Sequence, residues 1–149
     1  MDVFRDLYQQ LIIDHNKNPR NFCKLDNASH SADGYNPLCG DEITVSFIEK
    51  ESIIKNIAFM GSGCAISKAS ASIMTSSLKG MKVEDAKALF EKFHTLATTG
   101  ESTNDMGKLS VLAGVHKYPA RVKCATLAWH TLTSAINGKK EEVNTEVID

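Results

Sequence analysis

The sequence predicts an α+β fold in which helices pack on one face of a short antiparallel sheet. First, Ile43, Val45 and Phe47 alternate with polar residues, and a polar turn at 49–52 leads into a second apolar run at 53–60, as in a β-hairpin. Second, apolar residues recur at helical spacing before the hairpin and in several segments after it. The chain has 149 residues, and we expect a single domain over 1–138 followed by a flexible polar tail over 139–149.

The chain before the hairpin divides into a helix and a loop. The helix begins near residue 4 and ends near Asn18, because the residue before Pro19 avoids helical geometry. Residues 19–40 are rich in Asn, Ser, Asp and Gly, which favours an irregular loop. This loop leads directly into the first strand of the hairpin.

The chain after the hairpin is predicted to be helical. The last helix begins at Pro119, a residue favoured in the first helical turn, and ends at the stop signal Asn137-Gly138. Apolar spacing places three earlier helices in this part of the chain, from Ile66 to Lys79-Gly80, from Val83 to Phe93, and at 109–115.

Composition excludes some classes of partner. The formal net charge of −1 gives no reason to expect nucleic acid or an anionic membrane surface. No apolar run approaches the roughly 20 residues of a membrane span. The first residues carry acid where a signal peptide carries base, and no apolar segment follows them. We therefore expect a cytoplasmic protein, in a compartment that keeps thiols reduced.

Three of the four cysteines lie in contexts that suit metal binding. Cys39 and Asp41 lie at one end of the hairpin, and Gly61-Ser62-Gly63 brings Cys64 to the same end. Cys64 precedes a helix, whose positive N-terminal end favours a thiolate. Cys124 faces inward near the start of the last helix. Three sulfurs and one carboxylate oxygen complete a tetrahedral zinc shell, and the same residues could hold an iron–sulfur cluster.

The spacing of the cysteines does not by itself decide between metal binding and inert thiols. No C-x-x-C pair is present, and buried cysteines commonly act as small apolar residues. Asp41 could serve only to cap a turn. Cys23 has no recognisable role. His94, His116 and His130 fall on helix faces or in a loop, where we expect packing or surface roles rather than metal ligation.

Four short stretches, in this order, resemble the iron–sulfur assembly scaffold family, the IscU and NifU N-terminal group. Each motif alone is weak, but the four together are specific and cover about residues 4–137. They are His15-Asn16-Lys17-Asn18-Pro19-Arg20-Asn21, Asn36-Pro37-Leu38-Cys39-Gly40-Asp41, Gly61-Ser62-Gly63-Cys64-Ala65-Ile66-Ser67-Lys68-Ala69-Ser70 and Lys123-Cys124-Ala125-Thr126-Leu127-Ala128-Trp129.

Departures from the usual scaffold pattern resemble the SufU branch of this family. Lys123 stands where IscU scaffolds have histidine, and the stretch between Cys64 and Cys124 is longer. The segment 118–123 lacks the Leu-Pro-Pro-Val-Lys sequence that recruits a dedicated Hsp70 chaperone, so no such partner is expected. Cys23 replaces the glycine that usually follows Asn-Phe in relatives.

The resemblance implies a zinc-dependent sulfur relay rather than a stand-alone enzyme. In this branch the protein accepts persulfide sulfur from a SufS-type cysteine desulfurase, and a partner histidine replaces Cys39 on the zinc. Cys39 is then the sulfur acceptor, while Asp41, Cys64 and Cys124 keep the metal. We expect a monomer that binds a dimeric desulfurase transiently and passes sulfur to downstream iron–sulfur assembly proteins.

Several alternatives remain open at this stage. The chain could instead be a scaffold that assembles a transient iron–sulfur cluster on Cys39, Cys64 and Cys124 and transfers it to apo-proteins. It could also be a zinc-stabilised adaptor without sulfur chemistry. Arg121 and Lys123 could steer an anionic persulfide or dock the desulfurase, or could simply be the solvated start of a helix.

Overall fold

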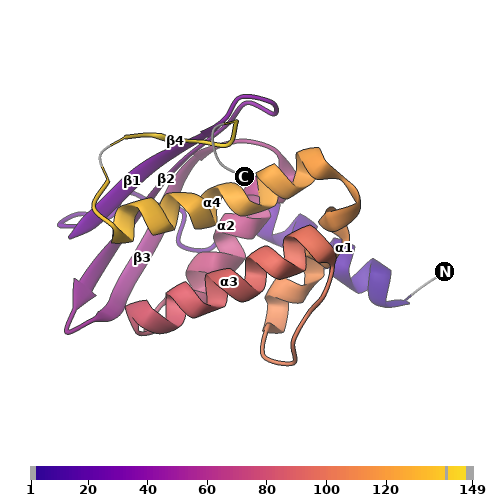
Figure 1. The fold of residues 1–149 in the computed structure, drawn as a ribbon, viewed down its shortest axis with the longest axis horizontal. Helices are drawn as coiled ribbons and strands as arrows, with labels where there is room; N and C mark the ends of the chain where they lie inside the picture. Colours follow the sequence, from indigo (N-terminus) through magenta and orange to yellow (C-terminus); the bar gives the residue numbers. More distant parts are fainter. Residues whose placement is uncertain (1–2, 140, 147–149) are drawn as a thin grey trace.

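The computed structural model describes residues 3–139 and 141–146, with side chains from residue 9 onward. Figure 1 shows the order of the helices and strands along the chain. The elements are α1 (Val3–Lys17), β1 (His30–Asn36), β2 (Asp41–Lys50), β3 (Ile53–Ser62), α2 (Ala65–Leu78), α3 (Val83–Thr99), the 3₁₀ helix η1 (Gly107–Lys117), α4 (Pro119–Ile136) and β4 (Val143–Asn144).

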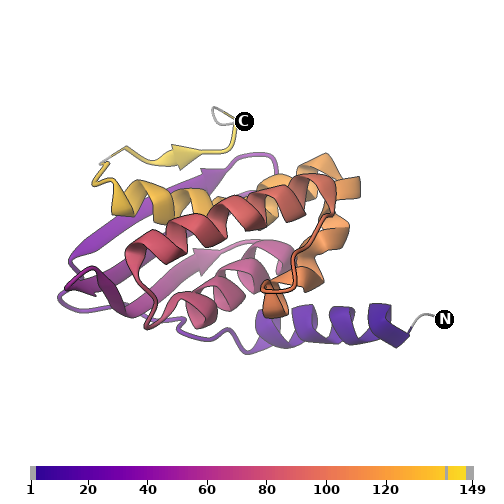
Figure 2. The ribbon, with the colours of Figure 1, turned by 60° about the horizontal axis from the view of Figure 1, so that its bottom comes forward.

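The strands form one sheet in the order β3-β2-β1-β4. β1 pairs with β2 and β2 with β3 in antiparallel orientation, whereas the short β4 runs parallel to β1. The helices lie on one face of this sheet (Figures 1 and 2), with α4 packed across β1 and β2 and α2 packed against β3. The predicted α+β fold with helices on one face is therefore confirmed.

The register of the sheet brings the 37–40 turn close to the end of β3. Asn36 is opposite Asp41 across β1 and β2, and Glu42 is opposite Ser62 across β2 and β3. The turn that carries Cys39 and the segment that enters α2 therefore lie at the same end of the sheet. This end positions the candidate metal ligands.

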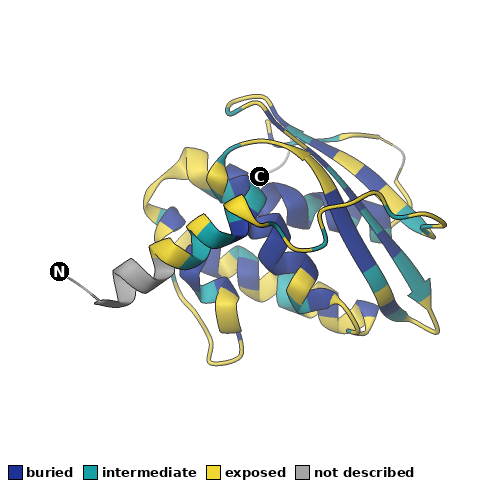
Figure 3. Cartoon of the chain, turned by 180° about the vertical axis from the view of Figure 1, so that it is seen from behind, coloured by how far each residue is buried: buried dark blue, intermediate teal, exposed yellow. Residues whose placement is uncertain are grey.

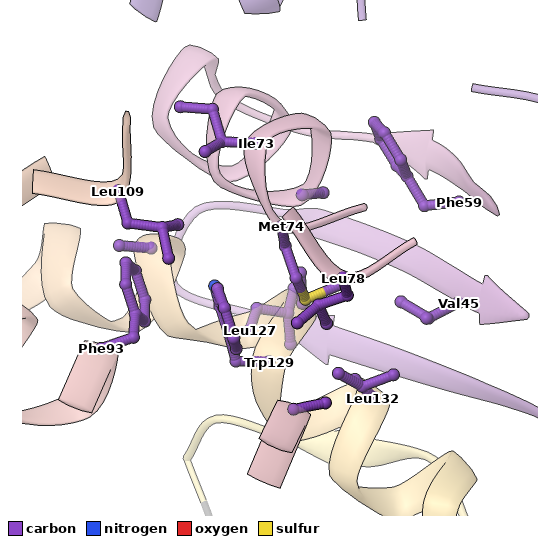
Figure 4. Packing of buried hydrophobic residues seen from close by; sticks show 14 of the residues in the cluster. Val45, Phe59, Ile73, Met74, Leu78, Phe93, Leu109, Leu127, Trp129 and Leu132 are labelled. Carbon is purple, nitrogen blue, oxygen red and sulfur yellow. The ribbon is translucent and has the colours of Figure 1, made fainter. Parts of the chain in front are cut away.

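The core lies between the sheet and the helices. Ile43, Val45 and Phe47 point into it, as the alternation in β2 predicts, and Trp129 of α4 stacks on Phe93 of α3 with ring centroids 4.6 Å apart. Figure 4 shows the close packing of these layers. Seen from behind, buried positions alternate with more exposed ones along the strands (Figure 3). Within the described residues, none of the helices is long and apolar enough to cross a membrane.

The strand β1 corrects the expectation of an irregular loop over residues 19–40. Its inward positions are Ala32, Gly34 and Asn36, which are small or polar and therefore give no apolar alternation. The small size is required by α4: a Cβ added at Gly34 would lie 2.1 Å from Thr131 Oγ1. Close packing of α4 on β1 thus removes the pattern by which a strand is usually recognised.

The C-terminal segment adds a short strand to the sheet, which the sequence analysis did not predict. Val143–Asn144 adds β4 to the edge of β1, and the Thr145 backbone N–H donates to the carbonyl of Tyr35 at 3.1 Å. Thr145 is buried although its neighbours in sequence are polar. Backbone pairing with a free strand edge depends little on side-chain polarity, so composition did not predict it. The predicted tail also includes residues 140 and 147–149, which lie outside the described residues.

Candidate metal centre

Side chains from three different segments converge at the end of the sheet. The Cys39 and Cys124 sulfurs and a carboxylate oxygen of Asp41 all lie within 4.8 Å of one another. Cys39 is on the turn between β1 and β2, Asp41 is the first residue of β2, and Cys124 is in the second turn of α4. Asp41 and Cys124 are buried, while Cys39 is partly exposed.

The two thiols of this group are close but not bonded. Cys124 Sγ lies 3.2 Å from Cys39 Sγ, well beyond the ~2.05 Å of a disulfide. Two thiolates on a tetrahedral zinc, with Zn–S bonds of about 2.3 Å, would lie about 3.8 Å apart. A shift of about half an ångström would bring the pair to that spacing, which is well within the reach of a turn residue such as Cys39.

Asp41 is fixed in place by two hydrogen bonds. Its Oδ1 accepts the Cys64 backbone N–H at 2.8 Å, and its Oδ2 accepts Asn36 Nδ2 at 3.0 Å. Gly63 lets this carboxylate approach the backbone, because a Cβ there would lie 2.5 Å from Asp41 Oδ1. The carboxylate of Asp41 therefore has a single defined position beside the thiols.

Cys64 lies next to the three-residue group without belonging to it. It caps the N-terminus of α2, and its sulfur accepts the Ser67 backbone N–H at 3.4 Å. A hydrogen bond from the Cys124 thiol lowers the pKa of Cys64 to about 6, assisted by the Ser67 N–H. The same thiol pair, together with burial, raises the pKa of Cys124. Of this pair, Cys64 is therefore the thiol whose ionised form the site favours.

Asn36 is a site residue that the sequence analysis did not single out. Besides its bond to Asp41, Nδ2 lies 3.5 Å from Cys124 Sγ, and the side chain is fully buried. One signal was available in the sequence. Asn36 directly precedes the turn at 37–40, which carries Cys39 and leads into Asp41, so a buried amide at this position would lie close to the ligands on either side of the turn.

Arg121 and Lys123 take different positions in the structure. Arg121 Nη1 is 4.0 Å from both Cys39 Sγ and Cys124 Sγ, and its pKa is raised, mainly by the contact with Cys124. Lys123 instead points to the C-terminal segment, where its Nζ lies 3.1 Å from Glu146. Of the two cationic residues, only Arg121 faces the sulfurs.

An apolar groove runs beside the candidate metal centre. Its volume is about 690 Å³, and Arg121 lies on both the groove and the thiol group. Leu38, next to Cys39, and Tyr118, at the start of α4, are large apolar side chains left exposed. The other residues that line the groove come from α1, α2 and η1: Gln9, Ile12, Ile13, Ile66, Val111, Gly114 and Val115.

The remaining cysteine and the histidines lie outside the group of Cys39, Asp41 and Cys124. Cys23 is exposed in the loop after α1. His15 is buried, and its Nδ1 lies 2.7 Å from Ser72 Oγ on α2. His130 packs against Phe90 and His94, and burial lowers its pKa to about 4. In the described part of the chain, no histidine joins the candidate ligands.

Comparison with known proteins places the chain in a single family. Residues 7–125 match the family described as NifU-like N-terminal domain. The chain is 43% identical to the zinc-dependent sulfurtransferase SufU of Bacillus subtilis (strain 168) over 138 residues, covering 91% of this chain and 92% of that protein. It is 40% identical to the iron–sulfur cluster assembly scaffold protein IscU of Streptococcus pyogenes serotype M1, covering 87% of this chain and 82% of that protein.

Solved structures share the fold as well. A putative iron–sulfur cluster assembly scaffold protein for the SUF system, from Fervidobacterium islandicum AW-1, superposes with a TM-score of 0.82 at 32% identity. The match covers 89% of this chain and 98% of that one. A crystal structure described only as a hypothetical protein superposes with a TM-score of 0.84 at 39% identity, covering 89% of this chain and 98% of that one.

Proposed function

The chain belongs to the NifU-like N-terminal domain family, and from this premise we propose that it is an iron–sulfur cluster assembly protein acting as a zinc-dependent sulfurtransferase. The observation that carries the proposal is the group formed by Cys39, Asp41 and Cys124, with Cys64 beside it. The resemblance of the sequence to the SufU of Bacillus subtilis supports the choice of this branch.

The donor set fits zinc. Two thiols and a carboxylate already lie within 4.8 Å of one another, and Cys64 lies beside them at the N-terminus of α2. We assign Cys39, Asp41, Cys64 and Cys124 as the ligands, three sulfurs and one carboxylate oxygen that fill a closed four-coordinate site. Bound zinc would hold the thiols as thiolates near neutral pH without taking part in redox chemistry.

Cys39 is the residue that we assign as sulfur acceptor. It lies on a four-residue turn and is partly exposed, whereas Cys124 is buried in α4 and Cys64 caps α2. A turn residue can advance toward a donor protein while the helix-borne cysteines stay in place. Exposed Leu38 beside it suits entry into another protein's active site.

The transfer is a thiol–persulfide exchange. The Cys39 thiolate attacks the outer sulfur of a donor persulfide, a bond forms between Cys39 Sγ and that sulfur, and the S–S bond of the donor breaks. The persulfide proton stays with the transferred sulfur, and the donor cysteine leaves as a thiolate, so no external oxidant or reductant is needed. Arg121, 4.0 Å from both sulfurs, stabilises the negative charge during this exchange.

The proposed donor is a SufS-type cysteine desulfurase. The apolar groove and Leu38 give this end of the molecule an apolar surface beside the acceptor thiol, as a transient protein contact requires. Downstream iron–sulfur assembly proteins would then take the sulfur from Cys39. The setting for this relay is the cytoplasm.

A second candidate function is that of a scaffold. Cys39, Cys64 and Cys124 would then hold a transient iron–sulfur cluster for transfer to apo-proteins. The similarity to the Streptococcus pyogenes scaffold protein IscU favours this alternative. Iron and acid-labile sulfide in anaerobically isolated protein would distinguish the scaffold from the sulfurtransferase.

Desulfurase turnover tests the proposed function. A SufS-type desulfurase with cysteine should release product faster when the zinc-loaded protein is present, and Cys39→Ala should abolish this stimulation while leaving the fold intact. Cys23→Ala is the matched control, because Cys23 is exposed and outside the ligand group. Stimulation that survives Cys39→Ala would refute the assignment of the acceptor.

A further inference from the structure

Asn36 touches two of the proposed metal ligands at once. It lies at the end of β1, opposite Asp41 in the sheet register, and is fully buried. Its Nδ2 donates to Asp41 Oδ2 at 3.0 Å and to Cys124 Sγ at 3.5 Å. The amide therefore connects a ligand on β2 to a ligand on α4.

The other end of this amide is held by the C-terminal segment. Thr145 Oγ1 donates to Asn36 Oδ1 at 2.9 Å, and Thr145 is 1% exposed. Its position is set by the backbone bond to Tyr35 and by β4, which pairs with β1 just before it. Among the described residues, no other hydrogen bond reaches Asn36 Oδ1.

The orientation of the Asn36 amide matters because its two ends are chemically opposite. Nδ2 is a donor and Oδ1 an acceptor, so a half-turn of the amide would place Oδ1 against the carboxylate of Asp41. The Thr145 hydroxyl satisfies Oδ1 and so favours the orientation in which Nδ2 faces the ligands. Without that hydroxyl, Oδ1 would be buried without a partner, which is unfavourable.

We infer that Asn36 is a positioning residue for the metal ligands Asp41 and Cys124, and that Thr145 fixes its orientation from the C-terminal strand. Hydrogen bonds of this kind orient metal ligands, and their removal typically weakens metal binding by 10–100-fold. The inference rests on the metal site of the proposed function but requires no sulfur transfer. It gives residues 143–145 a role in the site itself.

The test measures metal binding directly. Zinc affinity is determined by competition with a chromophoric chelator, and the ligand geometry by the absorption bands of the Co²⁺-substituted protein. Thr145→Val replaces the hydroxyl by a methyl group of similar size, and we expect about a tenfold or greater loss of zinc affinity with altered Co²⁺ bands. Thr145→Ser keeps the hydroxyl and should retain the affinity and bands of the unmodified protein. Asn36→Ala should weaken zinc binding at least as much as Thr145→Val.

Thr131→Val is the matched control. Thr131 is also fully buried, but its hydroxyl donates to the Leu127 carbonyl of its own helix at 2.8 Å. This variant should leave zinc affinity and the Co²⁺ bands unchanged. If Thr145→Val does not fold, Thr145→Ala removes the hydroxyl with less bulk and is compared with Thr145→Ser in the same way.

The outcomes separate this inference from the proposed function. Unchanged zinc affinity and Co²⁺ bands in Thr145→Val would overturn the inference alone. Equal weakening by Thr145→Val and Thr145→Ser would also overturn it, because packing rather than the hydroxyl would then be responsible. If the unmodified protein bound neither metal, the proposed zinc-dependent function would fail as well.

Discussion

Replacing Gly63 by alanine should damage the metal centre through one added methyl group. A Cβ at this position would lie 2.5 Å from Asp41 Oδ1 and 3.1 Å from Asp41 Cβ, whereas ordinary contact begins at 3.4 Å. The carboxylate must therefore retreat by about 0.9 Å, the difference between 3.4 and 2.5 Å. Asp41 is fully buried and held by Asn36 and by the Cys64 N–H, so it cannot retreat without breaking a hydrogen bond.

The expected size of the effect follows from this geometry. Overpacking of a buried site costs about 1–3 kcal/mol, and in a chain of this length about 2 kcal/mol lowers Tm by roughly 4–8 °C. Displacing a ligand that hydrogen bonds hold in place should weaken zinc binding by about 10–100-fold. Urea unfolding of the metal-free protein and chelator competition of the zinc-loaded protein measure the two effects separately.

Gly114→Ala is the matched control for Gly63→Ala. A Cβ at Gly114 meets nothing within 4 Å, and neither glycine has a positive φ. Gly114 lies inside η1, so Gly114→Ala can also gain some helix stability, and zinc affinity is the quantity that isolates the space available to the methyl group. Equal zinc affinity and equal unfolding free energy in the two variants would refute the reasoning, since the carboxylate of Asp41 would then not be fixed beside residue 63.

Three further predictions concern charged and titratable groups. The free energy of unfolding should fall as the pH drops from about 6.5 to 4, because burial lowers the pKa of folded His130 to about 4 while the same residue in the unfolded chain takes up a proton. His130→Phe should make the free energy of unfolding, measured by urea titration, depend less on pH in this range. An unchanged pH dependence would count against this role of His130. Lys123→Met breaks only the exposed ion pair with Glu146, so it should change the free energy of unfolding by less than about 1 kcal/mol. Zinc affinity, measured by chelator competition, should stay unchanged, and a clear loss of affinity would contradict the separation of Lys123 from the metal centre. Arg121→Met should slow sulfur transfer by about two- to fivefold, because an exposed charge is worth about 0.5–1 kcal/mol. A persulfide assay quenched at fixed times measures the rate, and no slowing would argue against a role for this cation.

Much of the fold could be predicted from side-chain periodicity, because the hairpin and the long helices bury regular apolar faces. The alternation of Ile43, Val45 and Phe47 gave β2, and Pro119 marked the start of α4. β1 could not be found in this way, since α4 packs so closely on it that Gly34 is required. β4 is held by backbone pairing and one buried threonine, which leave little trace in composition.

The candidate site was predictable to the extent that local geometry determines it. A hairpin brings the start of its first strand next to the end of its second strand, so the nearness of Cys39 and Asp41 to the segment that carries Cys64 follows from the sequence. The position of Asn36 depends on β1, which the sequence did not reveal, and its orientation depends on Thr145, more than a hundred residues away in the chain. The groove is lined by four helices whose relative placement no local pattern encodes.

The central claim is that Cys39 accepts sulfur, and mass spectrometry tests it most directly. Zinc-loaded protein is mixed with a SufS-type desulfurase and cysteine, the thiols are alkylated to trap persulfides, and the peptides are sequenced. The account predicts one added sulfur on Cys39 and none in Cys39→Ala. Added sulfur on Cys23 or Cys64, or no added sulfur at all, would contradict it.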